Sequence, residues 1–166
     1  ASGMAKARDL KKEKYNVVAL IGDGSLSGGE ALEGLSNAAV LNSNMIIIVN
    51  DNSMAIAPVE GGIYNSLAIL RETKGQTKDN IFKSMGYDYY YVEDGNNVES
   101  LIKTFTKVKD SNKPVVVHIH TLKGKGYEPA EQDKETYHWQ LPGFIERAGK
   151  VQPKVETYNT ITNDFI

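Results

Sequence analysis

Cysteine is absent from this 166-residue chain, and so are a strong net charge and any long apolar run. The absence of cysteine excludes disulfide bonds, zinc–thiolate sites and catalysis by a thiol. No apolar run approaches the roughly 20 residues that a membrane-spanning helix needs, and nothing resembles a signal peptide, so a cytoplasmic protein is expected. The formal net charge of −2 gives no reason to expect nucleic acid or an anionic membrane as a partner.

The apolar residues that are present follow a pattern typical of an α/β fold. They make up 40% of the chain, an ordinary share for a globular protein, and the length suits one domain with a substantial core. Continuous apolar runs predict strands that are covered on both faces, as in a parallel sheet. Helical spacing of apolar residues lies between these runs. We therefore predict an α/β fold, a mostly parallel sheet with helices on both faces.

Turn residues and caps give the expected bounds of these elements. The predicted strands are residues 17–21, 45–49, 88–92 and 115–121, and the predicted helices are residues 2–12, 28–41, 64–73, 79–85 and 98–108. A loop is expected over residues 123–130, and a short helical turn within residues 133–139.

Both ends of the chain suggest that it belongs to something longer. The first ten residues look like the middle of a helix, with no cap before them, so we expect a truncated N-terminus. Residues 140–166 carry few periodic signals. The expected organisation is therefore one domain over residues 1–139 and a linker or tail over residues 140–166, directed toward an absent domain.

Polar residues follow two neighbouring predicted strands at the point where each strand ends. Gly22-Asp23-Gly24-Ser25 follows the first strand, and Asn52 follows the next one, 29 positions after Asp23. The carboxyl ends of parallel strands are where ligands bind in open α/β sheets. Glycine supplies positive φ and lets backbone N–H groups approach a phosphate. Carboxylate, amide and carbonyl oxygens suit Mg²⁺, which typically takes one or two carboxylates together with phosphate oxygens and water.

Each motif also has a plainer interpretation, since the first could be a simple strand-to-helix turn and the second a polar loop. Their combination, in the expected strand–helix–strand frame, favours a magnesium–diphosphate site. The backbone carbonyl of Met54 could complete the ligand set.

Several segments, in order, resemble a known family. GDGSLSGGEALEGLSNAA followed by IIIVNDNSMAIAP is similar to the diphosphate-binding half of thiamine diphosphate enzymes of the transketolase superfamily. GMAKARDL, NDNSMAIAPVEGG, GYDYYYVEDGNNVESLI, KPVVVHIHT and KGKGYEPAEQDKETYH narrow the resemblance to the 1-deoxy-D-xylulose-5-phosphate synthases. The resemblance covers residues 3 to about 139 and implies thiamine diphosphate and Mg²⁺ as cofactors.

The resemblance assigns roles to individual residues. Asp23 and Asn52, with the carbonyl of Met54, resemble the magnesium ligands, and Gly24 and Ser25 resemble residues that contact the diphosphate. Together these five are also cofactor-binding residues of the family's pattern.

Two further residues in the C-terminal part of the resemblance have implied roles. Tyr127 resembles an aromatic residue close to the cofactor, although it could merely pack its loop. His138 resembles an active-site histidine, which gives it a catalytic role in proton transfer or phosphate recognition. Lys123 and Lys125 are more typical of solvated loop lysines than of phosphate ligands.

Histidines and tyrosines of the predicted strands could in principle bind a metal or a ligand. His118 and His120 face the same side of a strand, but no third ligand follows at a suitable spacing. A packed or hydrogen-bonded pair is therefore expected in preference to a metal site. The tyrosines at positions 89 to 91 are expected in the core and on the strand surface.

The chain departs from the family's pattern in ways that matter. The histidine-containing segment that precedes GMA in the family lies outside this sequence, the stretch between Pro58 and Asp79 is shorter than the family's, and Trp139 stands where a small residue is usual. The family's activating glutamate belongs to a following pyrimidine-binding domain. By resemblance, the complete enzyme is a homodimer that condenses pyruvate with D-glyceraldehyde 3-phosphate. The alternatives are another transketolase-like enzyme, such as a split subunit, and a cofactor-binding domain that is catalytically incomplete.

Overall fold

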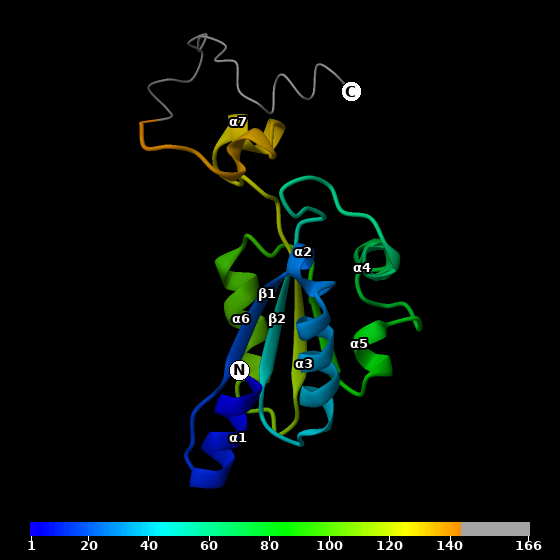
Figure 1. The fold of residues 1–166 in the computed structure, drawn as a ribbon, viewed down its shortest axis with the longest axis vertical. Helices are drawn as coiled ribbons and strands as arrows, with labels where there is room; N and C mark the ends of the chain where they lie inside the picture. Colours follow the sequence, from blue (N-terminus) through cyan, green and yellow to red (C-terminus); the bar gives the residue numbers. More distant parts are fainter. Residues whose placement is uncertain (144–166) are drawn as a thin grey trace.

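Four parallel strands form the centre of the molecule (Figure 1). The structure is a computed structural model that describes residues 1–143, so the expected tail lies almost wholly outside the described residues. The strands are β1 (Val18–Gly22), β2 (Ile46–Asp51), β3 (Asp88–Val92) and β4 (Val115–His120). They lie in the order β1-β2-β4-β3, and all three neighbouring pairs are parallel. The predicted parallel α/β fold is confirmed.

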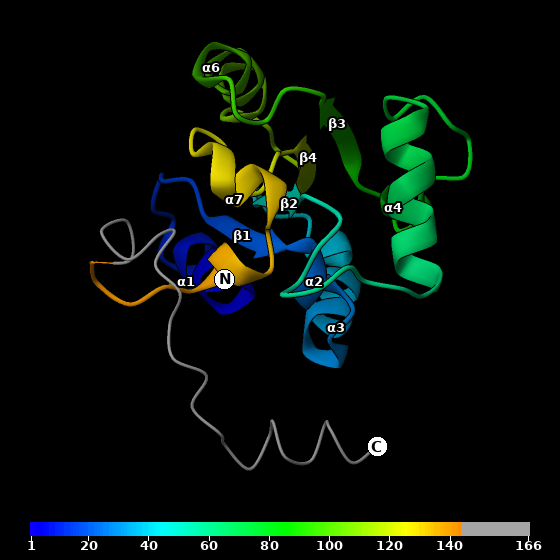
Figure 2. The same ribbon diagram turned by 90° about the horizontal axis from the view of Figure 1, so that it is seen from above.

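Helices cover both faces of this sheet (Figure 2). Helix α6 lies on one face, whereas α3 and α4 lie on the other. The helices are α1 (Ser2–Lys11), α2 (Asp23–Leu26), α3 (Gly29–Val40), α4 (Gly62–Glu72), α5 (Ile81–Ser84), α6 (Val98–Val108) and α7 (Glu128–Gln132), and a 3₁₀ helix, η1, spans Thr136–His138.

Two apolar clusters, one on each face, hold the helices to the central strands. On the first face, Ile47 and Val116 pack with residues of α1, α3, α4 and α5. On the second face, Ile46 and Val117 pack with Val108 of α6. Because alternate side chains of β2 and β4 enter opposite clusters, these strands are buried on both sides, as their continuous apolar runs predict.

The same prediction is wrong for β1. Ala19 and Ile21 pack against the first cluster, but Val18 is 51% exposed and Leu20 is 69% exposed. The reason is the position of β1 at the edge of the sheet. Helix α6 packs over β3 and β4 on that face, and within residues 1–143 no element covers the outward side of β1.

Three local expectations also need correction. Residues 123–130 were expected to form a loop, but they include the start of α7, whose proline near its first turn is a typical helix-start signal. Strand β2 continues to Asp51, so the polar sequence begins within the strand. Finally, Asp23 begins the one-turn helix α2, and neither Gly22 nor Gly24 has a positive φ.

Helix α6 begins at a side-chain cap that gives a first testable prediction. The Asn97 side-chain oxygen accepts a hydrogen bond of 3.0 Å from the Ser100 N–H. Replacing Asn97 by alanine should lower the free energy of unfolding by about 1 kcal/mol, because a donor of the first turn loses its partner. Denaturant unfolding measures this loss. The exposed Asn112, changed to alanine, is the control, and an equal loss in both variants would contradict the role of the cap.

Candidate functional site

The carboxyl ends of β1 and β2 meet at one edge of the sheet. The two strands are parallel, with Gly22 opposite Asn50, so Asp23 lies beside the loop that follows Asp51. An open pocket of about 370 Å³ lies at this edge. Its lining consists of Gly22, Asp23, Gly24, Ser25, Asn50, Asn52, Met54, Ala55, Ile56, Lys123 and His138. Six of the seven residues predicted for the site therefore line one pocket.

The predicted metal ligands converge on a single backbone nitrogen. The Met54 N–H donates to Asp23 Oδ2 at 3.0 Å and to Asn52 Oδ1 at 3.2 Å, so these two oxygens are neighbours. Asp23 is only 2% exposed. The arrangement offers one carboxylate, one amide oxygen and a nearby main-chain carbonyl, which is the small set of hard donors that Mg²⁺ uses when phosphates supply the other ligands.

The described residues offer no comparable set of ligands for a metal bound by protein side chains alone. Within residues 1–143 there is no group of three histidine, cysteine, aspartate or glutamate side chains arranged to hold a metal ion. His118 instead lies within hydrogen-bond distance of Asp51 and Tyr89. The site fits a magnesium ion bound jointly by protein and diphosphate, and it does not fit a zinc centre.

The electrostatics of Asp23 favour a cation. Burial raises the pKa of Asp23 above its ordinary value of 3.8, and the negative charge of Asp51 raises it further. The N–H groups of Gly24 and Met54 oppose this shift only in part. A buried carboxylate beside a second carboxylate is costly to ionise. A divalent cation would remove that cost, so the arrangement is suited to binding one.

Asp51 itself is a buried centre of hydrogen bonds that the sequence did not reveal. It is 0% exposed and accepts from Arg71 Nη1 at 2.5 Å and from His118 Nε2 at 2.8 Å, both through Oδ2. The Tyr89 hydroxyl lies 2.8 Å from Nδ1 of His118. Although burial opposes ionisation, the hydrogen bonds and charges of His118 and Arg71 hold the pKa of Asp51 below its ordinary value. Asp51 is therefore ionised and paired.

Gly24 is needed for space rather than for backbone conformation. A Cβ at this position would lie 2.7 Å from Ala55 Cβ and 2.9 Å from Ala55 Cα. The first turn of α2 thus lies directly against the loop that carries Asn52 and Met54. The Tyr64 hydroxyl, from α4, adds a contact of 3.3 Å to the Gly24 carbonyl and one of 2.7 Å to Ser27 Oγ.

This close approach gives a second prediction. Replacing Gly24 by alanine should push the Ala55 loop away from α2 and weaken binding of magnesium and diphosphate by about 10-fold or more, because the ligand oxygens would separate. Calorimetric titration of the cofactor measures the effect. Gly34 is the matched control, since it lies inside α3 and a Cβ there meets nothing within 4 Å. Its change to alanine should leave binding unchanged and raise stability by up to about 1 kcal/mol.

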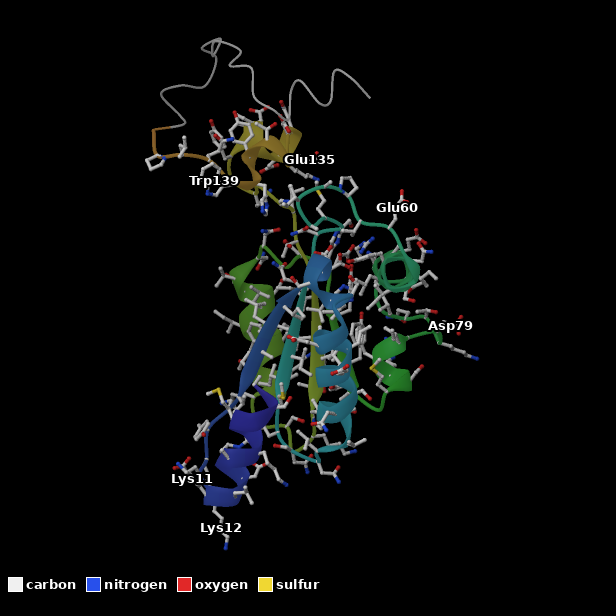
Figure 3. All side chains as sticks on the ribbon, viewed as in Figure 1. Lys11, Lys12, Glu60, Asp79, Glu135 and Trp139 are labelled. Atoms are coloured by element: carbon white, nitrogen blue, oxygen red, sulfur yellow. The ribbon has the colours of Figure 1, made fainter. Side chains whose placement is uncertain are left out.

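The C-terminal residues of the predicted site approach from above the sheet. In Figure 3, Glu135 and Trp139 lie at the same end of the molecule as Glu60, and Lys11 and Lys12 lie at the opposite end. His138, in η1, lines the pocket that contains Asp23. Tyr127 instead lines a neighbouring pocket of about 450 Å³, and its ring contacts that of Tyr137.

Lys123 connects these two pockets and is more involved than the sequence suggested. It lines both, together with Asn50 and Asn52, and its Nζ donates to the Ala55 carbonyl at 2.5 Å. Lys125 lines the second pocket and not the first. Strand register could have identified Asn50, because it lies opposite Gly22. The contact of Lys123 depends on a loop path that the sequence does not specify.

Comparison with known proteins gives the family. A sequence model described as 1-deoxy-D-xylulose-5-phosphate synthase matches residues 1–78 and 68–121. A synthase of this name from Listeria monocytogenes is 41% identical over 160 residues, covering 92% of this chain and 26% of that protein. One from Clostridium botulinum is 37% identical over 192 residues, covering 95% of this chain and 31% of that protein. The chain thus spans about a quarter to a third of the length of these curated relatives.

A solved structure supports the fold. The X-ray structure of a putative thiamin diphosphate-dependent enzyme from Mycobacterium smegmatis superposes with a TM-score of 0.52 and 22% identity, covering 72% of this chain and 21% of that one. In addition, the alignment with the Clostridium botulinum relative is longer than this 166-residue chain, so that relative has residues with no counterpart here. The family model and the curated relatives agree, and the chain belongs to the 1-deoxy-D-xylulose-5-phosphate synthase family.

Proposed function

We propose that this chain supplies the magnesium–diphosphate half of a thiamine diphosphate site. The enzyme would condense pyruvate with D-glyceraldehyde 3-phosphate to 1-deoxy-D-xylulose 5-phosphate and carbon dioxide. The observation that carries the proposal is the convergence of Asp23 Oδ2 and Asn52 Oδ1 on the Met54 N–H, at the joint carboxyl end of two parallel strands. Membership of the 1-deoxy-D-xylulose-5-phosphate synthase family supports interpreting these oxygens as magnesium ligands.

Five residues of the pocket would bind the metal and the diphosphate. Asp23, Asn52 and the carbonyl of Met54 would hold Mg²⁺, and Gly24 and Ser25, in the first turn of α2, would contact the diphosphate. The bound cofactor would supply the carbon nucleophile for the reaction, which no protein side chain provides. This chain's own contribution would be to bind and orient the inert end of the cofactor.

His138 and Tyr127 would act closer to the reacting groups. The position of His138 on the wall of the Asp23 pocket supports a role in proton transfer or in recognition of the substrate phosphate. Tyr127, on the wall of the neighbouring pocket, would contact the cofactor from the other side of Lys123. Both roles are assigned by family resemblance and are compatible with the pockets.

A pyrimidine-binding domain, on this polypeptide or on another chain, would complete the active site. Residues 1–139 would form the diphosphate-binding domain and residues 140–166 a connection toward the second domain. The chain matches only part of each curated relative, which leaves ample length for such a domain in those proteins. The assembled enzyme, meaning this chain together with its pyrimidine-binding domain, is expected to be a homodimer in the cytoplasm. Residues 1–143 contain no helix both long and apolar enough to span a bilayer.

A product assay tests the proposed reaction. With thiamine diphosphate, Mg²⁺, pyruvate and D-glyceraldehyde 3-phosphate, the assembled enzyme should release carbon dioxide and form 1-deoxy-D-xylulose 5-phosphate. Release of carbon dioxide should fall to background in a His138→Ala variant only if that histidine takes part in the chemistry. No carbon dioxide release from the wild-type enzyme would refute the synthase assignment.

A second candidate is another transketolase-like enzyme that acts on a different ketose or keto acid. It is favoured by the stretch between Pro58 and Asp79, which by the family resemblance is shorter than usual, because a shortened segment near the site would alter substrate selection. Turnover with another keto acid or ketose, in the absence of turnover with pyruvate, would identify this case.

Calorimetric titration with thiamine diphosphate and Mg²⁺ separates both enzymes from a catalytically incomplete binding domain. We expect weak or absent binding by this chain alone and tight binding by the assembled enzyme, because the cofactor site needs both domains. Tight binding without turnover of any substrate would support the incomplete domain.

A further inference from the structure

A buried polar chain leads from the core of the sheet to the loop with the candidate metal ligands. It begins at Tyr89 on β3, whose hydroxyl lies 2.8 Å from His118 Nδ1, and continues from His118 Nε2 on β4 to Asp51 Oδ2 at the end of β2. Arg71 of α4 reaches the same Oδ2 atom. His118 and Asp51 are both 0% exposed, so neither side chain is available to a ligand from solvent.

The imidazole of His118 is held in one orientation. Three aromatic rings surround it, with ring centroids 6.3 Å away for Phe82, 6.0 Å for Tyr89 and 5.3 Å for Tyr91. With Asp51 ionised, Nε2 donates to the carboxylate, and in the neutral ring Nδ1 accepts from the Tyr89 hydroxyl. A histidine contacted at both nitrogens and by three rings in edge-type packing is well suited to set the position of its partner.

The two oxygens of Asp51 have separate partners. Oδ2 receives His118 and Arg71, whereas Oδ1 accepts from the Ser53 N–H at 3.1 Å. Ser53 has a φ of 65°, a left-handed conformation that is unfavourable for a residue with a side chain. The hydrogen bond from Ser53 therefore holds a strained turn between Asn52 and Met54.

That turn sets the spacing of the candidate metal ligands. Asn52 and Met54, the candidate ligands on this loop, flank Ser53, and the Met54 N–H bridges Asp23 Oδ2 and Asn52 Oδ1. If Ser53 left its conformation, the Asn52 oxygen and the Met54 main chain would move relative to Asp23. Small displacements of this kind are enough to weaken a metal site, because outer contacts that orient ligands typically govern metal affinity by about 10- to 100-fold.

We propose that His118 and Arg71 are positioning residues for the magnesium site. They hold Asp51 so that it fixes the Ser53 turn, which brings the Asn52 and Met54 oxygens to Asp23. The inference rests on the proposed function, since it concerns the same cofactor site, and adds to it two residues from β4 and α4 that would never touch the metal.

Titration of Mn²⁺ into the assembled enzyme at saturating thiamine diphosphate, followed by the electron paramagnetic resonance signal of free Mn²⁺, tests the proposal. The variant His118→Phe keeps an aromatic ring of similar shape but removes both nitrogens. The variant His118→Gln restores an N–H donor close to the position of Nε2. Arg71→Met removes the second donor to Asp51 and keeps the hypothesis testable if His118→Phe fails to fold. Val117→Ala, on the same strand but facing the other core cluster, is the stability control.

The dissociation constant for Mn²⁺ should rise about 10- to 100-fold in His118→Phe and in Arg71→Met. It should return most of the way to the wild-type value in His118→Gln. In Val117→Ala it should stay unchanged even where the midpoint of thermal unfolding falls as far as in the other variants. This separation of metal affinity from stability is what a merely structural role would not produce.

Two outcomes would overturn the inference, and they can be told apart. Normal Mn²⁺ affinity in the His118 and Arg71 variants, beside tight binding by the wild type, would refute the positioning role and leave the proposed function intact. The same refutation follows if Val117→Ala weakens binding as much as His118→Phe. Absence of Mn²⁺ binding by the wild-type enzyme would instead refute the proposed function and, with it, this inference.

Discussion

Replacing Asp23 by asparagine should abolish tight binding of Mg²⁺ while making the metal-free protein more stable. The affinity for Mg²⁺ should fall by more than about 100-fold, which exceeds the usual cost of losing an outer contact, because Asp23 is the one carboxylate that residues 1–143 contribute to the pocket lining. Stability should rise because asparagine removes a buried charge beside Asp51. Burial has the larger effect in raising the pKa of Asp23, and the negative charge of Asp51 raises it further.

The opposite signs of these two effects make the experiment informative. Isothermal calorimetry with Mg²⁺ and thiamine diphosphate measures the affinity, and thermal unfolding of the metal-free assembled enzyme measures the stability. Asp79, labelled in Figure 3, is exposed and does not line the pocket, so its change to asparagine is the control. A loss of stability in Asp23→Asn would show that the carboxylate supports the fold. Unchanged Mg²⁺ affinity would refute its assignment as a ligand.

The raised pKa of Asp23 also predicts how the wild type responds to pH. The folded protein holds this proton more tightly than the unfolded chain, whose carboxyl has a pKa near 3.8. The contribution of Asp23 to stability is therefore present below 3.8 and is lost as the pH rises through the folded pKa. Mg²⁺ affinity should change in the opposite direction and fall as the pH drops through the folded pKa, because protons compete with the metal. Asp23→Asn should lose both dependences.

The sequence predicts those parts of the fold whose signals are local. The bounds of β3 and α6 agree with prediction, because Gly86, with a φ of 99°, and the capping Asn97 mark the approach to each element. The exposure of β1 could not be predicted in this way. Its apolar run is the same as that of a central strand, and only the order of the strands reveals that Val18 and Leu20 lie at an edge.

The same distinction applies to the site. Asp23 and Asn52 could be predicted because each directly follows the end of a strand, and parallel pairing brings strand ends together. The environment of Asp51 could not, since its partners come from α4 and β4, 20 and 67 positions later in the chain. No local pattern indicates that Arg71 and His118 reach one carboxylate. The pairing depends on how α4 packs across the sheet, which is a property of the tertiary structure.

Replacing Arg71 by methionine should lower the free energy of unfolding by about 3 kcal/mol. Asp51 would remain buried without Arg71, the cationic one of the three hydrogen-bond donors that the structure gives it, and breaking a buried ion pair from one side typically costs 3–5 kcal/mol. The lower end applies because the Arg71 side chain is 19% exposed and His118 still donates to Asp51. The double variant Arg71→Met with Asp51→Asn should lose much less than the sum of the single losses, because no unpaired charge remains.

Denaturant unfolding of the four proteins in this cycle, repeated at several pH values, measures the coupling. The pKa of Asp51 is lowered in the folded state, because the hydrogen bonds from His118 and Arg71 outweigh the larger single effect of burial, so its contribution to stability is present above 3.8 and is lost as the pH falls through the folded pKa. The wild type and Arg71→Met should therefore converge in stability in strong acid. Additive losses, or a difference between the two proteins that persists at low pH, would mean that Arg71 stabilises α4 through packing alone. In that case Arg71 would not hold Asp51 in place, and it could not position the Ser53 turn through that carboxylate.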